Sequence, residues 1–163
     1  ELEQAASLYM TRAAEKIRAQ KSVAGAVNVF VMTNRFRGND QQYSNSITIP
    51  LSAHSSDTRE LAAAALIGLK KIFRAGFKYK KLGVMLMDIQ SDTIQQGSLF
   101  SHSPAQPPDS SIMNALDSLN ARFGRDTLFI GSKGVSSKWE TKSENRTPGY
   151  TVSWDELPIA LAE

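Results

Sequence analysis

Residues 57–89 read DTRELAAAALIGLKKIFRAGFKYKKLGVMLMDI, and this stretch decides the fold because it encodes a helix followed directly by a strand. Asp57 and Glu60 form a capping-box pattern, which is typical of a helix N-terminus. Gly76 is placed to end the helix. The strand is predicted over residues 80–89. Within the helix, apolar residues recur every three or four positions, as in an amphipathic helix: Leu61, Ala65, Leu69, Ile72 and Phe73.

Three further elements are predicted upstream of this stretch. Residues 26–33 contain alternating valines, which favour a strand that is partly buried on both faces. Residues 44–52 alternate polar and apolar side chains as a second strand does, and Pro50 restricts that strand to a sheet edge or a strand end. Residues 2–20 predict an amphipathic helix, with Arg12, Lys16 and Arg18 on its solvent side and an apolar stripe of Leu2, Ala5, Ala6, Tyr9, Ala13 and Ile17.

The order helix, strand, strand, helix, strand predicts an α+β fold. It is most of a ferredoxin-like βαββαβ unit that lacks its first strand. In such a unit both helices cover one face of the sheet, and the other face is open for binding. The chain has no initiator Met and begins inside a predicted helix, so we expect a piece of a longer protein with the missing strand just before Glu1.

The remaining residues predict a linker and a small second unit, which divides the chain into residues 1–90, 91–108 and 109–163. The linker is polar and contains three prolines. The last segment predicts three short strands, within residues 127–131, 134–140 and 149–154, after a short helix that ends at Gly124 and carries Ile112, Leu116, Leu119 and Phe123. Because apolar residues are few, we expect a small C-terminal α+β extension that is weakly stable alone or packs elsewhere.

No catalytic or metal-binding constellation is visible in the sequence. Cysteine is absent, and the two histidines, His54 and His102, stand alone in Ser-rich segments predicted to be loops. Asp88 and Asp92 are interpreted as acids that end a strand rather than as a metal pair. GxSxG, P-loop and GxGxxG patterns do not occur. No apolar run reaches the ~18–20 residues that span a bilayer, and the start does not read as a signal peptide. We therefore predict no catalytic residues, no metal and no membrane partner.

Basic residues are concentrated in the first part of the chain. Residues 1–90 carry thirteen Lys and Arg against seven Asp and Glu, whereas residues 91–163 carry six against nine. Five basic residues flank strands, with Phe36 and Tyr79 among them: Arg35, Arg37, Lys78, Lys80 and Lys81. In a ferredoxin-like sheet these positions can lie along one rim, where they suit phosphate contacts that ignore base sequence. A merely solubilising surface is the alternative, and composition leaves both open.

Three segments resemble the C-terminal part of UmuC-type proteins, a branch of the Y-family DNA polymerases. In order along the chain they are QQYSNSITIPL, DTRELAAAALIGLKKIFRAGFKYKKLGVMLMDI and LDSLNARFGRDTLFIGSKGVSSKWETKSENRTPGYTVSWDEL. The resemblance implies that residues 1–90 are a little finger domain, whose open sheet face and basic rim lie against duplex DNA. Residues 109–163 would be the short C-terminal extension of this branch.

The resemblance also implies roles for individual residues. The DNA-contact role falls by position on Arg35, Arg37, Lys80 and Lys81, and then on Asn34, Ser44, Asn45 and Lys78. The palm, which holds the catalytic carboxylates and divalent metal of such polymerases, would be absent, so the fragment has no cofactor and is not itself an enzyme. It would act in the bacterial cytoplasm, at the nucleoid, in translesion synthesis and SOS mutagenesis after DNA damage.

A second binding role falls on the linker. Residues 96–100, QGSLF, match the bacterial sliding-clamp pattern of Gln, any residue, Ser or Asp, Leu and Phe, although Gly97 stands where Leu is usual. We therefore expect the clamp to be bound by Gln96, Ser98, Leu99 and Phe100, with the apolar pair as anchors. Packing of that pair onto its own domain is the alternative. The family also implies processed UmuD and RecA as partners of the extension.

An RNA-binding or protein-interaction module on the same scaffold is the competing hypothesis, because a fold does not determine a function. RNA-recognition sheets carry exposed aromatic residues on their central strands. Phe30 is the only aromatic residue within the predicted strands of residues 1–90. The sequence therefore favours the polymerase hypothesis.

Overall fold

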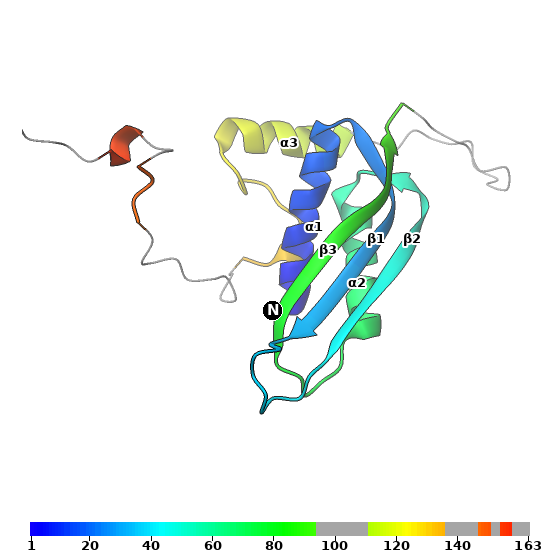
Figure 1. Cartoon of the computed structure of the whole chain (residues 1–163). Coiled ribbons are helices and arrows are strands. Elements are labelled where there is room, and N and C mark those ends of the chain that lie inside the picture. The colour runs from blue at the N-terminus through cyan, green and yellow to red at the C-terminus, as the bar shows by residue number, and fades with distance from the viewer. Residues whose placement is uncertain (94–110, 136–146, 151–153, 158–163) are drawn as a thin grey trace, which may run out of the picture.

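The computed structural model describes residues 1–93, 111–135, 147–150 and 154–157. Figure 1 shows helix α1 (Leu2–Ala19), strands β1 (Ser22–Thr33) and β2 (Ser44–Ser55), helix α2 (Thr58–Ile72), strand β3 (Tyr79–Ser91), helix α3 (Ser111–Phe123) and two 3-10 helices, η1 (Gly131–Lys133) and η2 (Trp154–Glu156). The predicted order of the first five elements is confirmed, and so is the α+β, ferredoxin-like class. Over the described ranges, no helix has the length and apolarity to span a bilayer.

The sheet has three antiparallel strands in the order β2-β1-β3, with β1 in the centre. Val29 of β1 is opposite Ile47 of β2 on one side and Val84 of β3 on the other. Pro50 lies opposite Ala26, next to the point where the pairing of β1 with β2 shifts register. β2 is thus an edge strand, which is where a residue without an N–H is tolerated.

The hydrophobic core lies between the sheet and the pair of helices α1 and α2, which cover one face (Figure 1). Val27, Val29 and Val31 of β1 are fully buried in one cluster with residues of both helices, including Leu61 of α2. The intervening β1 positions, among them Phe30, belong to the opposite face, because successive side chains of a strand alternate. The predicted arrangement, one covered face and one open face, is confirmed.

Helix α2 begins as predicted but ends earlier. Asp57 is the N-cap, and its carboxylate accepts a hydrogen bond from the backbone N–H of Arg59 (2.7 Å). The last helical residue is Ile72, four positions before Gly76. Phe73, assigned to the apolar stripe, is instead extended and 48% exposed, and its ring lies against that of Tyr79 (5.6 Å between centroids). The aromatic contact therefore competes with continuation of the helix.

Helix α1 presents most of the predicted apolar stripe to the core: Ala5, Ala6 and Ile17 are buried, and Leu2 and Ala13 pack against the core cluster. Met10 and Ala14 are fully buried, whereas Tyr9 is 40% exposed. Met10 and Ala14 thus add to the predicted stripe, and Tyr9 is the stripe residue that departs from the prediction. Arg18, predicted on the solvent side, is the larger correction, since its side chain is only 9% exposed.

Residues 111–135 of the C-terminal extension pack on α1 (Figure 1). Helix α3 forms as predicted and is followed by Gly124, whose φ is +102°. Its buried residues are Met113 and Leu116, while the other predicted apolar positions, Ile112, Leu119 and Phe123, are exposed. The strand predicted over residues 127–131 does not form, and the two later predicted strands lie largely outside the described residues.

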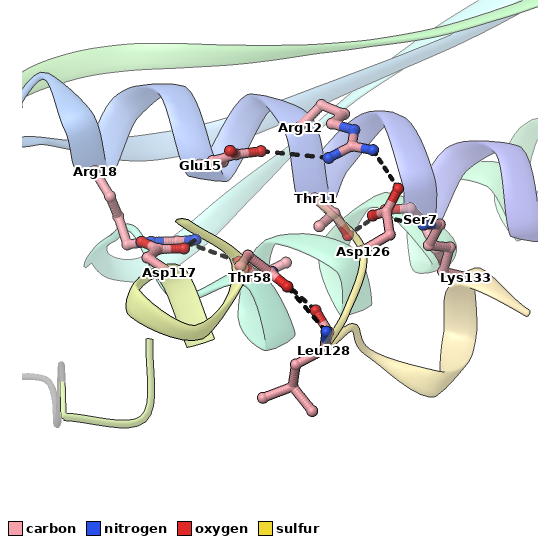
Figure 2. Close-up of polar contacts among 11 residues, drawn as sticks. Ser7, Thr11, Arg12, Glu15, Arg18, Thr58, Asp117, Asp126, Leu128 and Lys133 are labelled. Atoms are coloured by element: carbon pink, nitrogen blue, oxygen red, sulfur yellow. Dashed lines mark hydrogen bonds and ion pairs between the residues drawn. The ribbon is translucent and has the colours of Figure 1, made fainter. Parts of the chain in front are cut away.

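Ion pairs join the extension to α1 (Figure 2). Arg18 donates through two nitrogens to the two carboxylate oxygens of Asp117, both at 2.7 Å, and also to the backbone carbonyl of Ser56. Asp126 accepts from Arg12 (2.6 Å) and pairs with Lys133 (2.7 Å). These partners lie far from α1 in the sequence, so the pattern of α1 alone could not reveal that its basic side chains are paired.

Candidate nucleic-acid interface

The basic rim consists of Arg35, Arg37, Lys78, Lys80 and Lys81, and the sheet brings these residues to one end. Strand β1 ends at Thr33, which is opposite Tyr79 at the start of β3. Arg35 and Arg37 follow Thr33 in the β1–β2 loop. Lys78 directly precedes β3, and Lys80 and Lys81 lie among its first residues. The predicted juxtaposition of the two basic segments is confirmed, although their contact with DNA stays a prediction.

One acid lies within the basic rim. Asp40 pairs with Lys78 (Nζ to Oδ1, 2.9 Å) and lies 3.9 Å from Arg37. The side chains of Lys78 and Arg37 are nevertheless 74% and 69% exposed. Because exposed ion pairs are weak, both cations remain accessible to a polyanion. The remaining members of the rim, Arg35, Lys80 and Lys81, are exposed as well.

Hydrogen bonds fix the backbone of the β1–β2 loop. The side-chain amide of Gln42 donates to three backbone carbonyls, those of Asn34 (3.1 Å), Arg37 (3.0 Å) and Asp40 (3.1 Å). Asn34 accepts from the backbone N–H of Phe36 (3.1 Å). Asn34, a predicted DNA contact, therefore shapes the loop. The predicted contacts Ser44 and Asn45 open β2 directly after it.

An aromatic cluster lies at the same end of the sheet, next to the end of α2. Tyr43 lies against Phe77 (4.9 Å between centroids) and Tyr79 (6.1 Å), and the Arg74 guanidinium lies 5.1 Å from the Tyr43 ring. The Tyr43 hydroxyl donates to the Ile72 carbonyl at the end of α2. These contacts anchor the start of β2 to the helix layer and hold the rim in place.

The open face of the sheet adds residues that the sequence analysis did not select. A shallow hollow of about 530 Å³ is lined by Asn28, Phe30, Ser44, Asn45, Ser46 and Met85. Asn28 donates to Thr48 across the strands (2.9 Å), and the Phe30 ring lies over Gly83, where a Cβ would be 2.2 Å from a ring carbon. Alternation along β1 could have identified Asn28 and Phe30, because both face away from the buried valines.

His54 and Asp88 form a pair on the sheet that sequence reasoning dismissed. His54 lies within β2 rather than in a loop, and Asp88 lies within β3 rather than at its end. The His54 Nε2 and Asp88 Oδ2 atoms are 2.8 Å apart, across Gly25 of β1. No group of three His, Asp or Glu side chains that could hold a metal ion occurs among the described residues. The residues predicted to bind the clamp, Gln96, Ser98, Leu99 and Phe100, lie outside the described residues, and so does His102.

Comparisons with known proteins match nearly the whole chain. Residues 1–99 match the impB/mucB/samB family C-terminal domain, and residues 110–160 match a domain of unknown function, DUF4113. Protein UmuC of Salmonella typhimurium is 36% identical over 96% of this chain and 37% of its own length. Protein ImpB of Salmonella typhimurium is 33% identical over 98% of this chain and 37% of its own length. Protein MucB of Escherichia coli is 31% identical over 98% of this chain and 37% of its own length. The chain thus spans a little over a third of the length of these relatives.

Proposed function

Because the chain belongs to the impB/mucB/samB family, we propose that it is the DNA-binding and clamp-tethering region of an error-prone translesion DNA polymerase. The polymerase would act at the bacterial nucleoid in SOS mutagenesis. Its catalytic carboxylates and divalent metal would belong to a palm domain outside this sequence, and no reaction is assigned to the present residues.

The observation that carries the DNA-binding part is the basic rim beside the open sheet face. Its cations are exposed, come from two chain segments and are held on a braced loop and a strand end. Helices α1 and α2 pack against the sheet, and the hollow beside the rim is lined mainly by small polar side chains. Such a surface suits phosphate contacts, which confer affinity without reading the sequence. RNA recognition by the sheet is less well supported, because Phe30 is the one aromatic residue lining that hollow.

A charge-removal experiment tests DNA binding. Lys80→Ala with Lys81→Ala removes two cations of the rim, and the matched control, Lys70→Ala with Lys71→Ala, removes two exposed cations from the last turn of α2. We expect the rim variant to weaken duplex binding by about 10-fold or more at low salt and to reduce the salt slope by roughly 1 per lost phosphate contact. Fluorescence anisotropy measures both. Equal weakening by the two variants would mean general attraction between a basic protein and DNA.

The clamp-tethering part is tested by titrating the bacterial sliding clamp with the chain. Leu99→Ala with Phe100→Ala removes both apolar anchors, and Ile94→Ala is a control substitution in the neighbouring sequence. We expect saturable binding that is lost in the double variant and kept in the control, because a few apolar anchors carry most of such an interaction. Binding that survives the double variant would exclude residues 96–100 as the tether.

A further inference from the structure

Phe36 is the most exposed large apolar side chain on the described surface. Its exposed fraction is 98%, and it lies in the β1–β2 loop between the exposed cations Arg35 and Arg37. Burial of such a side chain would stabilise the protein, and this exposed position forgoes that stabilisation. Two other aromatic residues at the same end of the sheet, Phe77 and Tyr79, instead pack their rings against Tyr43.

The exposure of Phe36 follows from a well-defined loop geometry. The backbone N–H of Phe36 is held by the Asn34 side chain, and the next residue, Arg37, donates its N–H to the Asn34 carbonyl (3.2 Å). Gln42 then ties three carbonyls of the loop together, and its own side-chain oxygen accepts from Thr33 (2.9 Å). A ring presented on such a frame loses little conformational freedom when it binds, which favours affinity.

The neighbouring charges identify the kind of partner. A protein pocket that accepted Phe36 would also have to desolvate Arg35 and Arg37, whereas nucleic acid supplies phosphates for cations and flat bases for a ring. Bases inside an intact duplex are already stacked on one another. The ring therefore fits a base that is unpaired.

Resting on the proposed DNA-binding role, we propose that Phe36 is a stacking platform for an unpaired base, and that Arg35 and Arg37 hold the adjoining phosphates. The basic rim would then bind DNA at a junction, with the duplex along the open face and a single-stranded overhang across the loop. Different side chains would thus bind the duplex and the overhang, so an experiment can separate the two activities.

The test compares a blunt duplex with the same duplex bearing a short single-stranded overhang that contains 2-aminopurine. We expect the wild-type chain to bind the overhang DNA more tightly and to change the 2-aminopurine fluorescence. Phe36→Ala and Phe36→Leu should weaken overhang binding about 5-fold or more and abolish the fluorescence change, because neither has a π-face. Phe36→Tyr should preserve both, and blunt-duplex binding should change less than about 2-fold in all variants. All the variants should melt at the wild-type temperature, because the ring contributes no burial.

The outcomes separate this inference from the proposed function. If Phe36→Leu bound the overhang DNA as tightly as the wild type, the contact would be a general apolar one rather than base stacking, and the inference would be overturned. Unchanged overhang binding in Phe36→Ala would overturn it too, while duplex binding that depends on Lys80 and Lys81 would leave the proposed function intact. Failure of the wild-type chain to bind either DNA would overturn both.

Discussion

Gly25 occupies a β1 position over which two side chains from the neighbouring strands, His54 and Asp88, meet. A Cβ at this position would be 2.3 Å from Oδ2 of Asp88 and 2.7 Å from Nε2 of His54. Asp88 adopts a φ of +53°, in the left-handed region that side chains usually avoid. The absence of a side chain at Gly25 thus allows the histidine and the aspartate to reach each other across β1.

Gly25→Ala is expected to destabilise the protein by about 1–3 kcal/mol, because the new methyl group must displace both members of the pair. Gly38→Ala is the matched control, since a Cβ there would meet nothing within 4 Å. Urea unfolding of the two variants measures the difference. Equal stabilities would mean that His54 and Asp88 move aside without loss, and that their contact adds little to the fold.

Sequence periodicity could not foresee this pair. It assigns each residue to a face or a turn, and it assigned His54 to a loop because of the surrounding serines. The contact depends on the register of two strands on either side of a third, which no local pattern encodes. The buried valines were predictable for the opposite reason, because alternation within a single strand determines the face on which they lie.

At the scale of elements, α2 depends on Asp57 for its N-terminus. Burial acts to raise the pKa of Asp57, but the hydrogen bonds and charge of Arg59, together with the charge of Arg18, outweigh burial and lower it. A carboxyl group whose pKa is lowered in the folded state stabilises the protein at pH values above the ordinary pKa of that group. That stabilisation is lost as the pH falls through the folded-state value.

Asp57→Ala should therefore cost about 1 kcal/mol of stability at neutral pH through loss of the cap. Asp57→Asn should retain most of the cap, because an amide oxygen can accept from the Arg59 N–H, but it should lose the acid-dependent component below about pH 4. Thermal unfolding between pH 3 and 7 checks both expectations. A Asp57→Asn variant with the same acid dependence as the wild type would contradict this account.

The contact between α1 and α3 depends on Arg18. Its guanidinium satisfies Asp117 of α3 and also donates to Ser56 and Thr58 at the start of α2 (2.9 and 2.7 Å). It therefore joins three elements, although amphipathic spacing in α1 places it on the solvent side. The sequence located each of these helices, but pairing between residues ninety-nine positions apart is a tertiary property.

Arg18→Ala should destabilise the protein by about 2 kcal/mol and detach α3, because it leaves Asp117 and two further acceptors without their donor. Lys16→Ala, an exposed position on the same helix, should change stability by less than about 0.5 kcal/mol. Hydrogen exchange of the α3 backbone distinguishes loss of docking from global weakening. Unchanged exchange in α3 would show that its two buried apolar residues suffice.

At the scale of the whole molecule, residues 111–135 of the extension pack on α1, whereas the hollow described above lies on the open face of the sheet. Asp126 is the centre of a polar attachment between the extension and α1. Burial acts to raise the pKa of Asp126, but hydrogen bonds and charges from Lys133 and Arg12 outweigh burial, so the pKa is lowered. Because the folded-state pKa of Asp126 is lowered, this attachment is intact at neutral pH and is lost as acid protonates the carboxylate.

Acidification should therefore release the segment around Asp126 before the sheet and its two helices unfold. Amide resonances of Leu128 and Lys133 should shift below about pH 4 while those of the β1 valines stay unchanged. Asp126→Asn should show the released spectrum already at neutral pH. A single transition shared by all these amides would mean that the extension and the domain unfold together.

The side-chain amide of Gln42 has a consequence for how this surface can evolve. It holds the β1–β2 loop through backbone carbonyls, so the loop keeps its shape whatever side chains stand at positions 35–37. Natural selection could exchange those three residues with little effect on folding. Related proteins could thus diverge in what this loop contacts by varying one short tripeptide, while the scaffold beneath it stays constant.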